Sequence, residues 1–213
     1  MILRVYYRWV YYRRVDYRFS RLRAGSLSVI LLHGTPDETQ AMGNIAAPEM
    51  LARRWAEVIA DPALRDLPYK IELNARGKIE MSRASNAHGR FQFRVGAELL
   101  RLLPEGEVIT EASVLTVIGV RVPDVAWASR RFIETFGTVT PFPRAPEICV
   151  VVDSPSNTEE ETSEKIHAYL EAGAKEVWVV SEEGRVRYFA TGGERTGSAF
   201  GIEPSLPPPI AKP

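Results

Sequence analysis

Three acidic residues and one lysine occupy positions at which side chains could do chemistry. The acids are Glu72 in "YKIELN", Asp124 in "VRVPDVAW" and Asp153 in "CVVVDSP", and the lysine is Lys165 in "SEKIHAYL". Each acid lies in or at the end of a run that is typical of a strand. A carboxylate in such a run is costly to bury unless it is paired or bound to a cation. Each acid is therefore a candidate catalyst, metal ligand or backbone cap.

Each of these four residues also has a purely structural explanation. Asp124 can cap a turn after Pro123, and Asp153 can form an Asx-type turn or cap the following helix. Glu72 can be the solvent-facing residue of a half-exposed strand, and Lys165 can be a solvated lysine on a helix surface. Taken one at a time, the structural explanations are favoured.

The sequence lacks the patterns of several other chemistries. It contains no Gly-rich phosphate loop, no CxxC pair and no GxSxG motif. The histidines His33, His88 and His167 do not have metal-ligand spacing. Cys149 is the only cysteine and lies among Ile148 and Val150, which is typical of a small buried hydrophobic residue. The acids and the lysine remain as the candidates.

The elements that must position these residues alternate between helices and strands. Periodicity predicts helices over 48–61, 86–103 and 156–173, a hairpin of strands 69–73 and 78–81, short strands at 107–111, 114–117 and 121–128, a strand at 148–153, and a last hairpin around 182–184. Ser156 or Thr158 can cap the third helix, and Gly173 suits its end. Residues 129–145 are predicted to be a mobile loop. This order predicts an α/β fold with a mixed central sheet flanked by helices.

The chain divides into three parts by composition. Residues 1–46 form a basic and aromatic extension with a linker, 47–192 form the compact domain, and 193–213 form a Pro-rich tail. The first 24 residues carry seven Arg and one Asp, whereas the whole chain has zero net charge. The extension could contact nucleic acid or a membrane surface, or it could be a poorly ordered segment or follow from a misassigned start codon. The last two explanations are favoured.

Cysteine usage and hydropathy predict a cytoplasmic protein. A single cysteine allows no intrachain disulfide, which fits a reducing compartment. No apolar run approaches the roughly 20 residues that span a bilayer, so no membrane association through a span is expected.

The order of the candidate residues resembles the PD-(D/E)xK nuclease arrangement. Within that superfamily the chain is similar to the bacterial "putative restriction endonuclease" family, over about residues 68–190. The resemblance is carried by "PYKIEL", "GKIEMS", the helix with His88, "VRVPDVAWAS", "PEICVVVDSPSN", "EKIHAYLEAGAKEVWVV" and "GRVRYF". It implies a restriction-endonuclease-like mixed sheet flanked by helices, and a metal-dependent DNA endonuclease that hydrolyses phosphodiester bonds.

The resemblance also implies roles for individual residues. Asp124 matches the first metal ligand, Glu72 an accessory acid, and Lys165 the lysine that stabilises negative charge at the phosphate. With Asp153 as a further ligand, the implied metal set is Asp124, Asp153 and Glu72, for Mg²⁺ or alternatively Mn²⁺. DNA is the implied partner, and cutting both strands with one site per chain would favour a homodimer.

The sequence departs from the family pattern at the ligand strand. Val151 occupies the family's glutamate position, and Asp153 lies two residues further, on the same face and about 6.6 Å along at roughly 3.3 Å per residue. Arg83 also stands where the family tends to have proline. Two functions follow: an active endonuclease with Asp153 as a relocated ligand, or a catalytically impaired nuclease-fold protein that acts as a nucleic-acid-binding or interaction module.

Overall fold

The computed structural model describes residues 46–83, 85–153, 158–181 and 183–206. The basic extension therefore lies outside the described residues, apart from Ala46. Ser156, a predicted helix cap, and Glu182, the first residue of the predicted last turn, also lie outside them. Within the described part, no helix is long and apolar enough to cross a membrane.

The strands form two sheets rather than one. The larger sheet has the order β10-β9-β8-β7-β6-β3, and the smaller has the order β2-β1-β5-β4. The bounds are β1 (Tyr69–Asn74), β2 (Ile79–Arg83), β3 (Gly106–Ile109), β4 (Val114–Thr116), β5 (Gly119–Arg121), β6 (Val125–Ser129), β7 (Ile148–Val152), β8 (Glu176–Val180), β9 (Val186–Ala190) and β10 (Gly193–Arg195). Strands β7 and β8 are parallel, whereas the other pairs are antiparallel. The predicted mixed α/β fold is confirmed.

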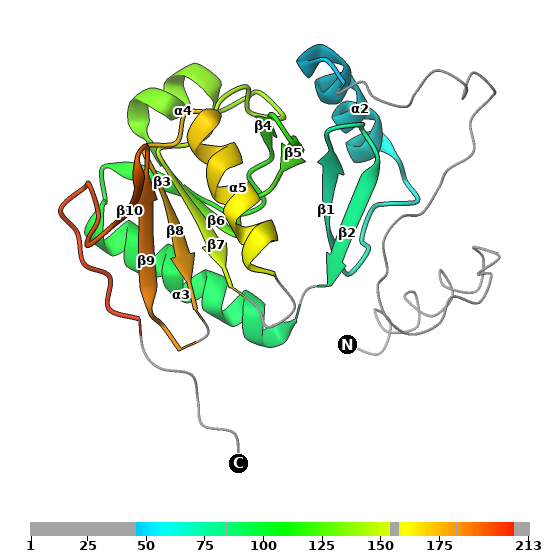
Figure 1. Cartoon of the computed structure of the whole chain (residues 1–213). Coiled ribbons are helices and arrows are strands. Elements are labelled where there is room, and N and C mark those ends of the chain that lie inside the picture. The colour runs from blue at the N-terminus through cyan, green and yellow to red at the C-terminus, as the bar shows by residue number, and fades with distance from the viewer. Residues whose placement is uncertain (1–45, 84, 154–157, 182, 207–213) are drawn as a thin grey trace.

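Two helices cover the larger sheet, one on each face (Figure 1). Helix α3 (Asn86–Leu102) packs on one face through a cluster that includes Leu99, Val125 and Trp178. Helix α5 (Glu159–Glu171) lies on the other face, where Ile166 and Tyr169 belong to a second cluster. Strand β7 is buried along its whole length because both of its faces are covered.

The hairpin β1–β2 stands beside the larger sheet together with helix α2 (Pro48–Ala60) (Figure 1). Leu51, Trp55 and Val58 of the helix pack with Leu73 and residues of β5 and its end. Strand β5 pairs with β1 only at the two residues that end β1. Earlier in β1, the contact toward the larger sheet is made by a side chain, since Lys70 pairs with Asp124 just before β6.

Local chemistry accounts for the helix starts. Thr158 begins α5 with a capping box, since its hydroxyl accepts from the Glu161 N–H at 3.1 Å and the Glu161 carboxylate accepts from the Thr158 N–H at 3.0 Å. The prediction of Thr158 as a cap is confirmed. Ser85 caps α3 through a single bond, in which its hydroxyl accepts from the His88 N–H at 3.0 Å.

Two predicted boundaries near the site were wrong. The strand predicted over 121–128 is broken into β5 and β6, because Pro123 has no N–H for a ladder and Asp124 follows it in a bend. The segment predicted as a loop, 129–145, contains helix α4 (Arg130–Phe136). Ser129 caps this helix, a signal that the Thr- and Gly-rich composition further along obscured.

The segment expected as a tail from residue 193 begins with strand β10 and then packs on the core. Phe200, Ile202 and Leu206 lie against the cluster under α3. The buried Glu176 carboxylate accepts from the Ser198 hydroxyl at 2.6 Å and from the Ala199 N–H at 2.7 Å. Residues 193–206 are thus part of the compact structure.

Candidate functional site

The Asp124 carboxylate lies at the end of the larger sheet and joins three elements. Its Oδ2 accepts from the Val152 N–H of β7 at 2.7 Å. Its Oδ1 lies 2.7 Å from Lys70 Nζ of β1, and 3.2 Å from both His88 Nε2 and Gln92 Nε2 of α3. The side chain is buried. Asp124 therefore does more than cap the turn after Pro123.

The surroundings of Asp124 keep it ionised. Burial alone would raise the pKa of Asp124, but the hydrogen bond from His88 and the charge of Lys70 outweigh it and hold the pKa well below its usual range. Burial alone would lower the pKa of Lys70, because it disfavours the charged ammonium. The negative charges of Asp124 and Glu72 outweigh this effect, so the pKa of Lys70 lies above its ordinary value. At neutral pH the two side chains form a charged pair.

Glu72 is buried and faces the larger sheet, so its explanation as a solvent-facing strand residue was wrong. Its Oε1 accepts from the Val122 N–H at 2.8 Å. Its Oε2 lies 3.5 Å from Arg121 Nη1 and 3.6 Å from Lys165 Nζ. Arg121 also pairs with Glu80 at 2.5 Å. The structure thus brings Lys165 of α5 to the predicted acid of the hairpin.

This network predicts a measurable stability effect. We expect Glu72→Ala to lower the free energy of unfolding by about 3 kcal/mol, because it leaves the buried Arg121 with only Glu80 and leaves the Val122 N–H unpaired. Chemical denaturation followed by circular dichroism measures it.

A matched control is Glu57→Ala, which removes an exposed ion pair with Arg54 on α2. That change should cost less than about 1 kcal/mol. Equal losses in the two variants would contradict the importance of the buried network.

Val151 lies where Asp124 meets β7, and it offers no ligand. The Asp124 N–H donates to Val150 O at 2.9 Å, and the Asp124 carboxylate accepts from the Val152 N–H. Asp124 is therefore bonded to the residues on both sides of Val151. The Val151 side chain is buried in the cluster with Ile166 and Tyr169. Within the described residues the Tyr169 hydroxyl is buried without a hydrogen-bond partner.

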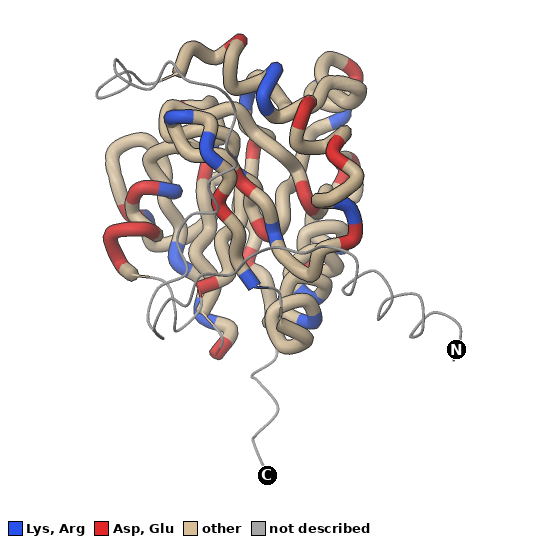
Figure 2. Tube along the Cα trace, turned by 90° about the vertical axis from the view of Figure 1, so that its right-hand side faces the viewer, with Lys and Arg blue, Asp and Glu red and all other residues tan. Residues whose placement is uncertain are grey.

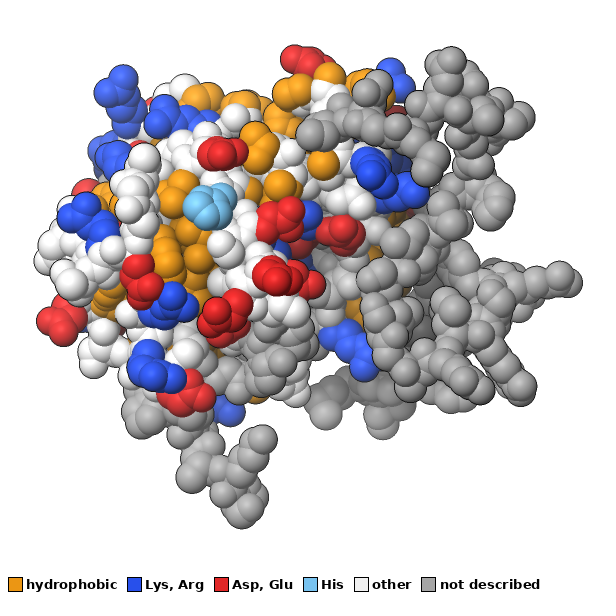
Figure 3. All heavy atoms as spheres, in the orientation of Figure 1, with side chains coloured by type: hydrophobic (Ala, Val, Ile, Leu, Met, Phe, Trp, Pro, Cys, Tyr) orange, Lys and Arg blue, Asp and Glu red, His pale blue; other side chains and the backbone are white. Residues whose placement is uncertain are grey.

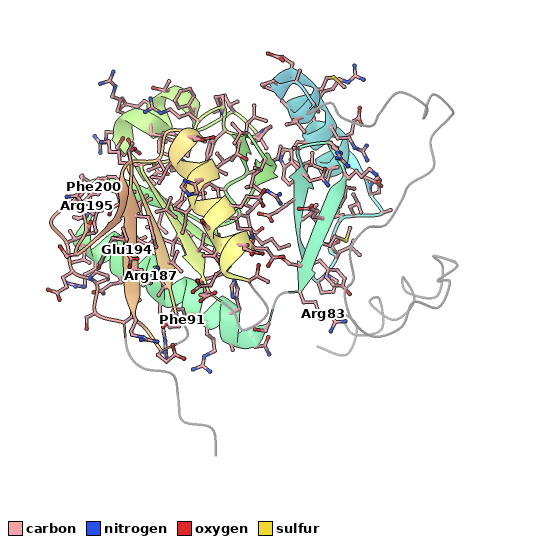
Figure 4. The ribbon with its side chains drawn as sticks, in the orientation of Figure 1. Arg83, Phe91, Arg187, Glu194, Arg195 and Phe200 are labelled. Atoms are coloured by element: carbon pink, nitrogen blue, oxygen red, sulfur yellow. The ribbon has the colours of Figure 1, made fainter. Side chains whose placement is uncertain are left out.

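Asp153 makes none of the side-chain contacts that join the other candidate residues, within the part of the chain that the structure describes. The Asp153 N–H continues the ladder by donating to Val180 O at 2.8 Å. The negative charge of Asp153 makes a small contribution to raising the pKa of Arg187 on β9, after the larger effect of Glu194. Figure 4 shows Arg187 on the far side of the larger sheet from the hairpin. Among the described residues, no hydrogen bond or ion pair joins Asp153 to Glu72, Asp124 or Lys165.

The oxygens of Asp124 and Glu72 are held by protein donors. Among the described residues no three His, Cys, Asp or Glu side chains come together as a metal-binding group. Asp124 Oδ1 already meets Lys70, His88 and Gln92, whereas Mg²⁺ needs oxygen ligands at 2.0–2.1 Å in octahedral geometry. The expectation of Mg²⁺ or Mn²⁺ held by Asp124, Asp153 and Glu72 stays a prediction.

Three residues of the site were not singled out from the sequence: Lys70, Gln92 and Arg121. Lys70 is two positions from Glu72, and strand side chains repeat with period two, so the pair could have been placed on one face. Gln92 follows His88 by four positions, which puts both on one face of a helix. The pairing of Arg121 with Glu72 has no such local signal.

Charge around the site is mixed rather than basic. Figure 2, seen from the hairpin side, shows acidic and basic positions interspersed. The first turn of α5 carries Glu159, Glu160 and Glu161, and acidic side chains gather on the face that carries this helix (Figure 3). Arg83, which departs from the family pattern, is exposed at the end of β2 (Figure 4).

The chain is similar to a known protein family and to solved structures. The family model Uma2, described as "Putative restriction endonuclease", matches residues 61–208. A crystal structure of a "putative nuclease belonging to DUF820" from Anabaena variabilis is similar in fold, with a TM-score of 0.50 and 19% identity. That match covers 58% of this chain and 73% of the other. No curated protein matches significantly.

Proposed function

Because this chain belongs to the Uma2 family, we propose that it binds DNA by a backbone phosphate, with metal-dependent cleavage impaired by Val151. The phosphate would lie at the group formed by Lys70, Asp124, Glu72, Arg121 and Lys165, called here the Asp124–Lys165 site. The observation that carries this proposal is the apolar, buried Val151 beside an Asp124 whose oxygens are already held by protein donors. The site would then position a phosphodiester without the ion that hydrolysis in this family is expected to need.

The charges of the site support binding without a metal. Lys70, Arg121 and Lys165 balance three carboxylates: Lys70 pairs with Asp124, Arg121 pairs with Glu72 and Glu80, and Lys165 pairs with Glu72. A fourth carboxylate at position 151 would leave the set negative and would repel a phosphate. Valine leaves it neutral.

The lysines are the groups with which a phosphate can pair. The Lys165 side chain is 27% exposed and the Lys70 side chain 15%, so both are more accessible to solvent than their partner acids, although Lys70 is mostly buried. The acidic first turn of α5 opposes a strand that approaches along that helix. A strand approaching over the hairpin avoids it.

A second candidate function is a Mg²⁺- or Mn²⁺-dependent DNA endonuclease. The observation that favours it is that Lys70 lies near both Asp124 and Glu72, and that Glu72 in turn lies 3.6 Å from Lys165. Asp124, Glu72 and Lys165 are the residues whose catalytic roles the family resemblance implies. In that case the chain would hydrolyse phosphodiester bonds although Val151 supplies no ligand.

One set of measurements separates the two candidates. Fluorescence anisotropy with labelled DNA in EDTA should give binding that weakens with salt, and Lys165→Ala should weaken it and reduce the salt slope by about 1. Lys175→Ala, which changes an exposed lysine on the loop before β8, should have no effect. Supercoiled plasmid should stay intact in Mg²⁺ and Mn²⁺.

Two outcomes would change the conclusion. Nicking by the parent chain that Asp124→Ala abolishes would establish the second candidate instead. Absence of DNA binding at low salt, with or without metal, would overturn both candidates.

A further inference from the structure

A hollow of about 440 Å³ lies between helix α2, strand β1 and the segments that flank β4. Its walls include the aromatic side chains of Trp55, Tyr69 and Phe142, together with the aliphatic side chains of Ile59 and Val139. Hollows of this volume are at the lower end of the range that holds small ligands. The size suits one nucleotide and not the end of a duplex.

Exposed apolar side chains concentrate at this hollow. Ile59 is 53% exposed, Val139 43% and Tyr69 38%, and these are three of the seven large hydrophobic residues exposed in the described part of the chain. Trp55 is itself buried, and its indole N–H has no hydrogen-bond partner among the described residues. Apolar surface gathered around a concavity marks a place where a ligand or partner is bound.

The hollow adjoins the Asp124 site across one strand. Tyr69 lines the hollow, and its chain neighbour Lys70 pairs with Asp124. Val122 lines the hollow as well, and its N–H donates to Glu72. Glu111 of the rim is close enough to Lys70 to influence its charge state. Tyr69 and Lys70 project to opposite faces of β1, so a molecule held at Lys70 would have to pass around the Tyr69 end of the strand to enter the hollow.

The rim carries one charge of each sign. Arg65 and Glu111 both line the hollow, the former able to donate to a phosphate and the latter able to accept from an exocyclic amino group. A planar ring with hydrogen-bonding edges matches aromatic walls with a polar rim better than an aliphatic chain does. Base stacking on aromatic side chains is the usual means of holding unpaired nucleotides.

We propose that this hollow binds an unpaired nucleobase of the DNA strand whose phosphate lies at the Asp124–Lys165 site, with Tyr69 stacking on the base. The substrate class is then single-stranded or locally unpaired DNA rather than a closed duplex. This inference rests on the proposed function, since the phosphate site and the hollow act on one strand.

The test is the affinity for single-stranded and duplex DNA of the same sequence, about twelve nucleotides long, in EDTA. The full chain should bind the single strand about tenfold more tightly than the duplex. Tyr69→Ala should lose about tenfold for the single strand and little for the duplex, because one stacking ring is removed. Phe93→Ala, a matched change of a ring that is 74% exposed on α3, should leave both affinities unchanged.

A second variant guards against a folding defect in Tyr69→Ala. Ile59→Glu places a carboxylate at the rim from a position on α2 that is already half exposed, and it should cause the same selective loss. Thermal melts of both variants should match the parent.

The outcomes distinguish this inference from the proposed function. If Tyr69→Ala and Ile59→Glu bind the single strand like the parent while Lys165→Ala binds weakly, the base pocket is wrong and the phosphate site stands. If the parent prefers the duplex, the inference is overturned as well. If the parent binds neither form of DNA, both proposals fail.

Discussion

Replacing Val151 by glutamate is expected to give the chain Mg²⁺-dependent nicking of supercoiled DNA, at a rate about 100-fold or more above the parent. The new carboxylate would lie beside Asp124, at the position where the family pattern has its glutamate. A gain of about 100-fold corresponds to roughly 2.7 kcal/mol of transition-state stabilisation, which is an ordinary contribution for one electrostatic group. Plasmid nicking with and without Mg²⁺ measures it.

The fold is expected to accept this carboxylate. Glutamate and valine have similar volumes, so the substitution neither overfills nor empties the space beside Ile166 and Tyr169, although glutamate is longer and polar. Two buried donors near the ligand acids, the Tyr169 hydroxyl and Arg121 Nε, have no hydrogen-bond partner among the described residues. A buried carboxylate that meets such donors avoids most of the usual cost of burial.

Controls make the Val151→Glu experiment decisive. Val151→Gln has the same shape without the charge and should not nick DNA, and adding Asp124→Asn to Val151→Glu should remove the gained activity. Mg²⁺ should also raise the Tm of Val151→Glu but not that of the parent. A folded Val151→Glu variant that neither nicks DNA nor responds to Mg²⁺ would show that more than this one ligand is missing.

Asp124→Ala is expected to lower the free energy of unfolding by about 3–5 kcal/mol. The substitution leaves Lys70 as a buried ammonium without its partner and removes the acceptor of the Val152 N–H. It also removes the polar contacts of Lys70 on β1 and of His88 and Gln92 on α3 with the end of the larger sheet. Urea or guanidinium denaturation measures the loss.

Asp61→Ala is the matched control for Asp124→Ala. Asp61 accepts from the Ala63 N–H in an exposed turn after α2, so its removal should cost about 1 kcal/mol or less. A loss of similar size for both variants would mean that the Asp124 pairs contribute little beyond a turn cap.

The same carboxylate predicts a pH dependence. The pKa of Asp124 is depressed in the folded chain, so its contribution is fully present above its unfolded pKa of about 4 and is lost as the pH falls from there toward the folded pKa. The difference in stability between the parent and Asp124→Asn should therefore shrink below about pH 4. A difference that stays constant down to acid unfolding would contradict an ionised, paired Asp124.

Much of the fold could be predicted because its signals are local. The alternation in "YKIELN", the apolar run of β7 and the cap at Thr158 depend on residues only a few positions apart. The split between β5 and β6 was also readable from Pro123, although it was not predicted. The separation of the strands into two sheets depends on long-range pairing and could not be read from these patterns.

The sequence by itself determined that Val151 replaces the family glutamate and that Glu72, Asp124 and Lys165 remain. Only the tertiary structure decided which of them meet. Lys70 and Asp124 are 54 positions apart, and Arg121 and Glu72 are 49 apart, so no local pattern could pair them. It also extended the ladder between β7 and β8 to the Asp153 N–H, which donates to Val180 O. Ion pairs form between side chains that folding brings together, and their choice of partner is a property of the packed sheet rather than of any one strand.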